Sequence, residues 1–169
     1  MKLKITSYKL QATSYPVLFI GRFQPFHLGH LDAIKQILRR HKKVTIGIGS
    51  SQFFSEPKNP FSAELRKKMI EKSLIEAGVS KNKFSIFKIP DINNDNLWVS
   101  HVEKIVPRFD IIYSGSRHVQ KLFRRHGKYK IKLPKFNLKI SATMVRGKMK
   151  RKQNWQKLVP KAVSRLINL

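Results

Sequence analysis

Short apolar runs alternate along this chain with segments in which apolar residues recur at helical spacing. Residues 17–20 form a continuous apolar run that is typical of a buried strand. In the next segment, residues 31–38, apolar positions recur at the spacing of one helix face. The same alternation continues to the C-terminus. The pattern predicts strands at 17–20, 44–48, 84–89, 111–113 and 129–131, and helices at 31–38, 62–77, 98–106, 119–123, 143–150 and 159–167.

This order of elements predicts an α/β fold. Strands that alternate with helices favour a Rossmann-like, doubly wound parallel sheet of about five strands, with right-handed crossovers and helices on both faces. We expect a single domain over residues 16–169 and an N-terminal extension over residues 1–15. The extension is a short added strand or a frayed terminus, or else an organellar presequence, because it has Lys, Ser and Thr and no acidic residue. Ligands of such folds bind at the carboxyl ends of the strands.

The turn after the first strand carries the clearest chemical signal. It reads Gly-Arg-Phe-Gln-Pro-Phe-His-Leu-Gly-His from Gly21 to His30. Gly21 closes the strand, Pro25 sets the turn, and His27 and His30 stand three apart where a helix begins. The free N–H groups and the dipole of a helix N-terminus attract anions, and two histidine rings add hydrogen-bond donors. The segment predicts a nucleotide-phosphate site.

The charge is extreme and unevenly distributed. The net charge is +27, and no acidic residue follows Asp110, whereas seventeen Lys or Arg do. A positive field concentrates anionic substrates at an active site. The surplus is consistent either with a solvated basic face or with weak, non-specific binding of nucleic acid.

Other features narrow the class of protein. The chain has no cysteine, which excludes disulfides and thiolate zinc sites. No apolar run approaches the roughly 20 residues that span a bilayer, and the first ten residues lack the apolar core of a secretory signal. We therefore expect a cytoplasmic protein.

The motif and the segments after it resemble the H-x-G-H nucleotidyltransferases, and more narrowly the archaeal-type nicotinamide-nucleotide adenylyltransferases. The likeness covers residues 16–169 in unbroken order. Its further elements are residues 47–52, residues 59–63 with Arg66, residues 89–92 before Trp98, residues 113–115, residues 140–146, Trp155 and residues 158–160.

The resemblance implies transfer of AMP from ATP to nicotinamide mononucleotide (NMN), which gives NAD and pyrophosphate. It implies direct in-line attack without a covalent intermediate, Mg²⁺ carried by the ATP phosphates with no metal ligand from the protein, and a homo-oligomer. Because the attacking phosphate is already ionised, catalysis needs positioning and charge stabilisation rather than a general base. The expected catalytic residues are His27, His30, Arg22 and Arg146. The expected ATP-binding residues are Gly21, Arg22, Phe23, His27, Gly29, His30, Gly115, Ser141, Thr143 and Arg146. The expected NMN-binding residues are Gln52, Lys58, Asp91, Ile92, Trp98 and Ser116.

The chain also departs from the family pattern. Ser116 and Asp95 stand where the family usually has asparagine, Ala142 replaces a glycine, and Lys58 replaces an arginine. Trp98 is either a stacking surface for the nicotinamide ring or a core residue. Two alternative functions remain open: adenylyl transfer to another phosphorylated acceptor, such as phosphopantetheine or an FMN-like molecule, and a basic nucleic-acid-binding or regulatory role on the same fold.

Overall fold

A five-stranded parallel sheet forms the centre of the molecule. The computed structural model describes residues 16–168; the predicted N-terminal extension, residues 1–15, lies outside the described residues. The strand order is β3-β2-β1-β4-β5, so the first strand is central. In β1, Phe19 pairs with Ile46 on one side and with Tyr113 on the other. The strands are β1 (Val17–Gly21), β2 (Val44–Ile48), β3 (Phe84–Lys88), β4 (Ile111–Ser114) and β5 (Lys130–Lys132).

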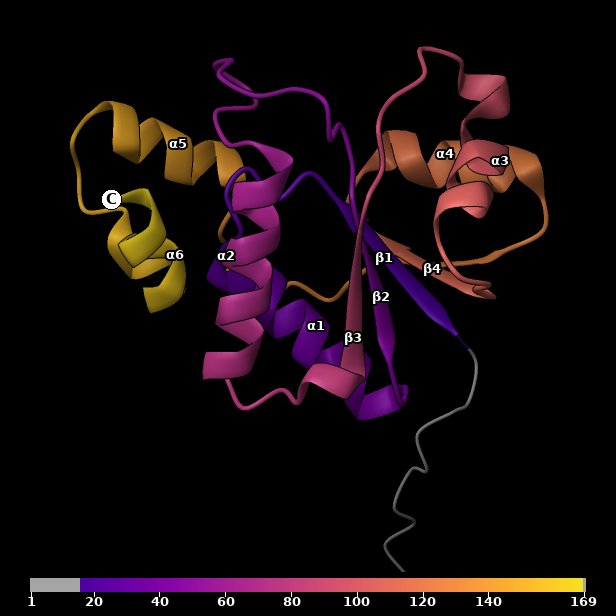
Figure 1. Cartoon of the computed structure of the whole chain (residues 1–169), viewed down its shortest axis with the longest axis horizontal. Helices are drawn as coiled ribbons and strands as arrows, with labels where there is room; N and C mark the ends of the chain where they lie inside the picture. The colour runs from indigo at the N-terminus through magenta and orange to yellow at the C-terminus, as the bar shows by residue number, and fades with distance from the viewer. Residues whose placement is uncertain (1–15, 169) are drawn as a thin grey trace, which may run out of the picture.

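Alternate residues of the central strand belong to two hydrophobic cores. Val17 and Phe19 face the core that α1, α2, α5 and α6 complete, whereas Leu18 and Ile20 face the core formed with α3 and α4. Figure 1 shows α3 and α4 on one side of the sheet, and α1 and α2 on the other. The doubly wound prediction is confirmed. The helices are α1 (Leu28–Arg40), α2 (Ala63–Glu76), α3 (Asp95–Ile105), α4 (Arg117–His126), α5 (Ala142–Lys150) and α6 (Lys161–Ile167), with 3₁₀ turns at Lys81–Lys83 and Gln156–Leu158.

Capping residues explain where the helix boundaries differ from the prediction. Helix α3 begins at Asp95 rather than Trp98, because the Asn94 side chain accepts hydrogen bonds from the backbone N–H groups of the first turn. Helix α4 begins at Arg117 because Ser116 caps it in the same way. The last helix begins at Lys161 rather than at residue 159, with Pro160 as its N-cap residue, and a 3₁₀ turn at Gln156–Leu158 precedes it.

No helix among residues 16–168 is both long enough and apolar enough to cross a membrane.

Candidate functional site

Two cavities adjoin each other at the carboxyl edge of the sheet. Cavity 1, of about 620 Å³, lies among the end of β1 and the first turns of α1 and α5. Cavity 2, of about 550 Å³, lies among the end of β1 and the first turns of α3 and α4. Both cavities are lined by Gly21, Arg22 and Ser116. The end of β1 is therefore the place where ligands of the two cavities can touch.

The two motif histidines stand together on the wall of cavity 1. His27 is the N-cap of α1, and its ring stacks on that of His30 with 3.6 Å between the ring centres. The Nδ1 atom of His30 accepts a hydrogen bond from the backbone N–H of His27 at 3.2 Å. A neutral His30 therefore carries its proton on Nε2, where it is available as a donor. The Nδ1 atom of His27 is buried and has no hydrogen-bond partner among residues 16–168.

Burial keeps both imidazoles neutral near pH 7. It lowers the pKa of His27 to about 4. Burial also lowers the pKa of His30 well below its usual value, and the neighbouring His27 lowers it further. Neutral rings donate hydrogen bonds to phosphate oxygens without a permanent charge, and an incoming polyanion raises their proton affinity. The two rings can thus donate stronger hydrogen bonds as negative charge develops on a phosphate.

Gly29 acts through His27 rather than by lining the cavity. A Cβ atom at Gly29 would lie 3.1 Å from two atoms of the His27 ring. A side chain at this position would push the ring away from its stacked position. The absence of a side chain at Gly29 thus leaves room for the His27 ring.

The first turn of α5 supplies the opposite wall of cavity 1. Ser141 caps the helix by accepting from the backbone N–H of Met144 at 3.1 Å. Arg146 donates to the carbonyl of Gln24 at 2.7 Å and to the Thr143 hydroxyl at 3.3 Å. The predicted Ser-x-Thr-x-x-Arg element therefore lies against the turn that carries the histidines. Its hydroxyls, helix N-terminus and guanidinium face one space.

Cavity 1 is lined by cationic groups and by no carboxylate. The cations are Arg22, Lys139 and Arg146. Of the ten predicted ATP-binding residues, only Gly29 does not line this cavity. Lys139, Phe136, Leu138 and Met144 also line it and were not predicted. The segment 136–139 has no helix or strand pattern that could have indicated its position.

Arg66 is a structural residue of the site whose role sequence reasoning missed. Its side chain is fully buried, and its guanidinium donates to the carbonyls of Arg22, Gly49 and Ser50 at 2.8, 2.9 and 3.1 Å. Burial, followed by the charge of Arg22, lowers the pKa of Arg66 to about 10, so it stays charged at neutral pH. Arg66 therefore ties the turns after β1 and β2 to α2.

Cavity 2 brings together three of the predicted NMN-binding residues: Asp91, Trp98 and Ser116. Trp98 is only 7% exposed and makes an edge-to-face contact with Phe123, at 6.0 Å between ring centres. The same indole also lines the cavity. The two interpretations of Trp98 are thus compatible, because one part of the ring fills the core and another part is open to a ligand.

The other three predicted residues do not line cavity 2. Gln52 exchanges two hydrogen bonds with the backbone of Asp91, at 2.9 and 3.0 Å, and so holds the loop that borders the cavity. Ile92 is partly buried and packs against the core that contains Trp98. Lys58 is exposed in the loop between β2 and α2.

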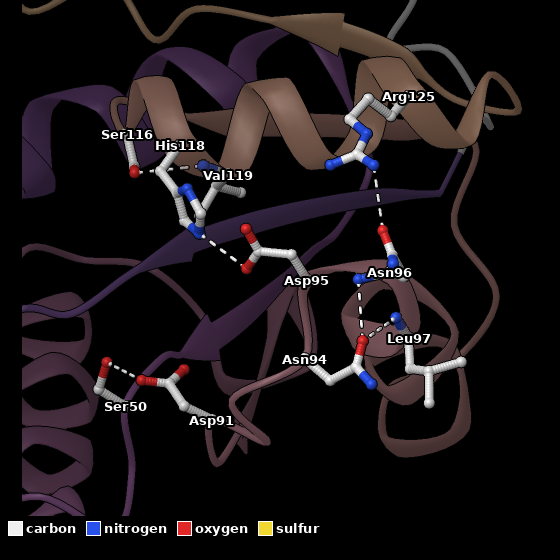
Figure 2. A network of polar contacts seen from close by, with 10 residues as sticks. All are labelled: Ser50, Asp91, Asn94, Asp95, Asn96, Leu97, Ser116, His118, Val119 and Arg125. Atoms are coloured by element: carbon white, nitrogen blue, oxygen red, sulfur yellow. Dashed lines mark hydrogen bonds and ion pairs between the residues drawn. The ribbon is translucent and has the colours of Figure 1, made fainter.

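A contact between a histidine and a carboxylate links the two helices that border cavity 2. The Nε2 atom of His118 in α4 lies 3.3 Å from a carboxylate oxygen of Asp95 in α3, and both residues line the cavity. Figure 2 shows the Asp95 carboxylate directed at the His118 ring, whereas Asp91 is directed at Ser50. The Ser50 hydroxyl donates to Asp91 at 2.7 Å. The pair was not predicted, because it joins residues on different elements.

Comparison with known proteins gives the class to which this fold and site belong. The model of the cytidylyltransferase-like family matches residues 18–148, a segment that includes every residue lining the two cavities. The chain belongs to this nucleotidyltransferase family.

Individual proteins that resemble this chain over most of its length are nicotinamide-nucleotide adenylyltransferases. That of Thermococcus sibiricus is 44% identical over 147 residues, which cover 86% of this chain and 79% of the relative. That of Picrophilus torridus is 43% identical over 150 residues, which cover 88% of each chain. These relatives confirm the resemblance that the sequence motifs indicate.

A solved structure agrees with the fold. It is that of a bifunctional NMN adenylyltransferase/ADP ribose pyrophosphatase from Francisella tularensis, in complex with AMP and a manganese ion. The TM-score is 0.75 at 27% identity, and the match covers 93% of this chain. Because it covers 50% of the other chain, the present chain spans about half the length of that bifunctional protein.

Proposed function

We propose that this protein transfers the adenylyl group of ATP to NMN and so forms NAD and pyrophosphate. An oxygen of the NMN phosphate attacks the α-phosphorus of ATP and forms the new P–O bond. The bond between the α-phosphorus and the bridging oxygen breaks, and pyrophosphate leaves with the electron pair. No proton is transferred in this step, so the site needs no general base.

The observation that supports this function most strongly is the junction of the two cavities at Gly21 and Arg22. ATP occupies the cationic cavity 1, and NMN occupies cavity 2 with its phosphate toward the junction. Arg22 screens the repulsion between the two phosphates as they approach. His27, His30 and Arg146 donate to the phosphates that gain charge as pyrophosphate leaves. Ser141 and Thr143 contribute hydroxyls at the helix N-terminus.

A divalent metal, Mg²⁺ in our proposal, enters with ATP. No cluster of three or more metal-ligating side chains occurs among residues 16–168, and cavity 1 has no carboxylate on its wall. The side chains around cavity 1 therefore fit a metal that is held by the phosphate oxygens of ATP rather than by a set of protein ligands. When bound, the ion supplies positive charge that screens the triphosphate.

The direct test is incubation with ATP, Mg²⁺ and one acceptor at a time. The acceptors are NMN, phosphopantetheine and FMN, and the readouts are pyrophosphate and the adenylylated product. We expect NAD from NMN and little product from the others. Preferred use of another acceptor would support the first alternative function. No pyrophosphate with any acceptor would support a binding or regulatory protein.

Assembly as a homo-oligomer, a location in the cytoplasm and weak binding of nucleic acid are further proposals. The last is supported by the seventeen cations after Asp110, of which only Lys139 and Arg146 line cavity 1. Size-exclusion chromatography with light scattering measures the assembly, and a salt series measures the binding.

A further inference from the structure

We propose that the outer line of helix α4, formed by Arg117, Lys121 and Arg124, binds the phosphate backbone of double-stranded nucleic acid without reading its base sequence. This binding is separate from adenylyl transfer, because none of the three residues lines cavity 1 or cavity 2. It gives a defined surface to the weak nucleic-acid binding proposed above.

Helix α4 has two sides of opposite character. Leu122 and Phe123 lie on the inner side, where they are buried in the core formed with α3. At 3.6 residues per turn, positions 117, 121 and 124 fall on the opposite side of the helix, within about 60° of one another. All three side chains are exposed. The outer line is therefore a row of cations that points into solvent.

Acidic side chains neutralise the cations of this region on the side that faces α3. There His118 lies 3.3 Å from Asp95, and Lys128, just after the helix, pairs with Glu103 at 2.8 Å. Figure 2 shows the His118 ring directed toward the Asp95 carboxylate. No ion pair among residues 16–168 includes a residue of the outer line. The outer line thus keeps its positive charge.

Other lysine-rich surfaces of the molecule differ from the outer line. In α2, each of the three acidic residues is in an ion pair, with Lys81, Lys88 or Arg165, so charges of both signs alternate there. The segment 148–152 has no acid, but it spans the end of α5 and does not form one helix face. Within it, Arg151 donates to the side chain of Gln153 at 3.2 Å.

The spacing of the outer line suits the backbone of a duplex. With a rise of about 1.5 Å per residue, Arg117 and Arg124 lie about 10 Å apart along the helix axis. Successive phosphates of one DNA strand lie about 3.4 Å apart along the duplex axis, so a segment of that length holds three of them. Arginine also binds phosphate oxygens through two parallel hydrogen bonds. Each residue of the line can therefore reach a phosphate.

Two other anionic partners fit this surface less well. A helix that lies on a membrane inserts its apolar side among the lipids, but the apolar side of α4 is already buried, with Phe123 fully enclosed. Unpaired strands are bound in part by stacking of their bases on aromatic side chains, and the outer line has none. Contact with a duplex backbone needs neither feature.

The experiment measures the fluorescence anisotropy of a labelled DNA duplex with the full chain, at salt concentrations from about 50 to 200 mM. One variant removes the outer line, and a control variant removes three cations from α2 and so changes the net charge equally. Glutamine is used throughout because its helix propensity is high. The substitutions are Arg117→Gln, Lys121→Gln and Arg124→Gln in the α4 variant, and Lys67→Gln, Lys68→Gln and Lys72→Gln in the α2 control.

We expect the wild type to bind two duplexes of unrelated sequence equally well at low salt. Each phosphate contact contributes about −0.9 to the log–log salt slope, so the slope of the α4 variant should be shallower by about 2.7. Its affinity at low salt should fall at least about tenfold. The α2 control should keep the wild-type slope. Thermal melting followed by circular dichroism shows that both variants are folded.

Several outcomes would overturn this role of α4. They are no binding of duplex by the wild type at low salt, equal losses in the two variants, and binding of vesicles that contain phosphatidylserine without binding of duplex. Formation of NAD, measured in the same variants, should be unchanged, because neither set of residues lines a cavity. A wild type that binds duplex through α4 but forms no NAD would contradict the proposed function and support this surface.

Discussion

Replacement of Arg66 provides the sharpest test of how the site is built. In Arg66→Met, the carbonyls of Arg22 and Gly49 lose the only hydrogen bonds that they receive from residues 16–168. An unsatisfied buried carbonyl costs about 1–3 kcal/mol. The bond to Gly49 is buried and that to Arg22 is partly buried, so the Arg22 carbonyl adds less and the expected loss is about 2–4 kcal/mol. That is a large share of the roughly 5–15 kcal/mol that stabilises a typical domain.

A second consequence concerns geometry. Ser50, whose carbonyl Arg66 also binds, has a φ of 49°, in the left-handed region that a serine rarely adopts. Such a conformation persists only where the surroundings enforce it. We therefore expect the turn after β2 to relax in the variant and the KM for both substrates to rise, because the turn meets Arg22 at the junction.

The assay is urea unfolding together with steady-state kinetics for three variants. Arg66→Lys keeps the charge but lacks the fork that binds several carbonyls, so its loss should fall between that of Arg66→Met and zero. Lys68→Ala, an exposed position of the same helix, is the control and should change stability by less than about 0.5 kcal/mol. The reasoning is wrong if Arg66→Met is as stable as this control, or if it loses stability with both KM values unchanged.

Three further predictions follow from the site and the charge. In His30→Ala, kcat should fall about 10²–10³-fold with a smaller effect on ATP binding, as measured by calorimetry; near wild-type turnover would contradict the role of the motif. The pKa of His27 is about 4 in the folded state and about 6.5 in the unfolded chain. The contribution of His27 to the free energy of unfolding should therefore be constant above pH 6.5 and fall by up to about 3 kcal/mol as the pH drops to 4. Unfolding at pH 7.5 and 4.5 tests this, and His27→Asn should show a smaller difference. Finally, filter binding should detect nucleic acid at low salt without sequence preference, with a log–log salt slope of about −0.9 per phosphate contact; no retention at low salt would exclude the interaction.

The parts of the site that could be predicted are those that local sequence determines. The segment from Gly21 to His30 is a strand end, a turn and a helix start in ten consecutive residues, so its elements can be recognised from the local sequence alone. The same holds for Ser141 to Arg146 at the start of α5. Accordingly, nearly all of the predicted ATP-binding residues line one cavity.

Contacts between distant segments could not be predicted in this way. Arg66 is one cation among many in the sequence, and only the three-dimensional fold brings the carbonyls of Arg22, Gly49 and Ser50 around it. Lys58 has the charge expected of its family position, but the loop that carries it leaves it outside the second cavity. The early start of α3, by contrast, had a local signal, because asparagine at position 94 is a favourable N-cap.

The topology explains why two cavities meet at the end of the central strand. Helix α1 leaves β1 toward one face of the sheet, whereas α4 leaves the neighbouring β4 toward the other, so a crevice opens between their first turns. Ligands that enter from the two faces can meet only at the end of β1. A Cβ atom at Gly21 would lie 2.9 Å from the Phe23 ring, so a glycine keeps this meeting point open. The predicted ATP-binding residues that line cavity 1 come from the end of β1, the first turns of α1 and α5, and the turn after β4. Of the departures from the family pattern, Asp95 at the start of α3 lines cavity 2, Ala142 at the start of α5 lines cavity 1, and Ser116 before α4 lines both, so these departures lie around the same crevice as the motif.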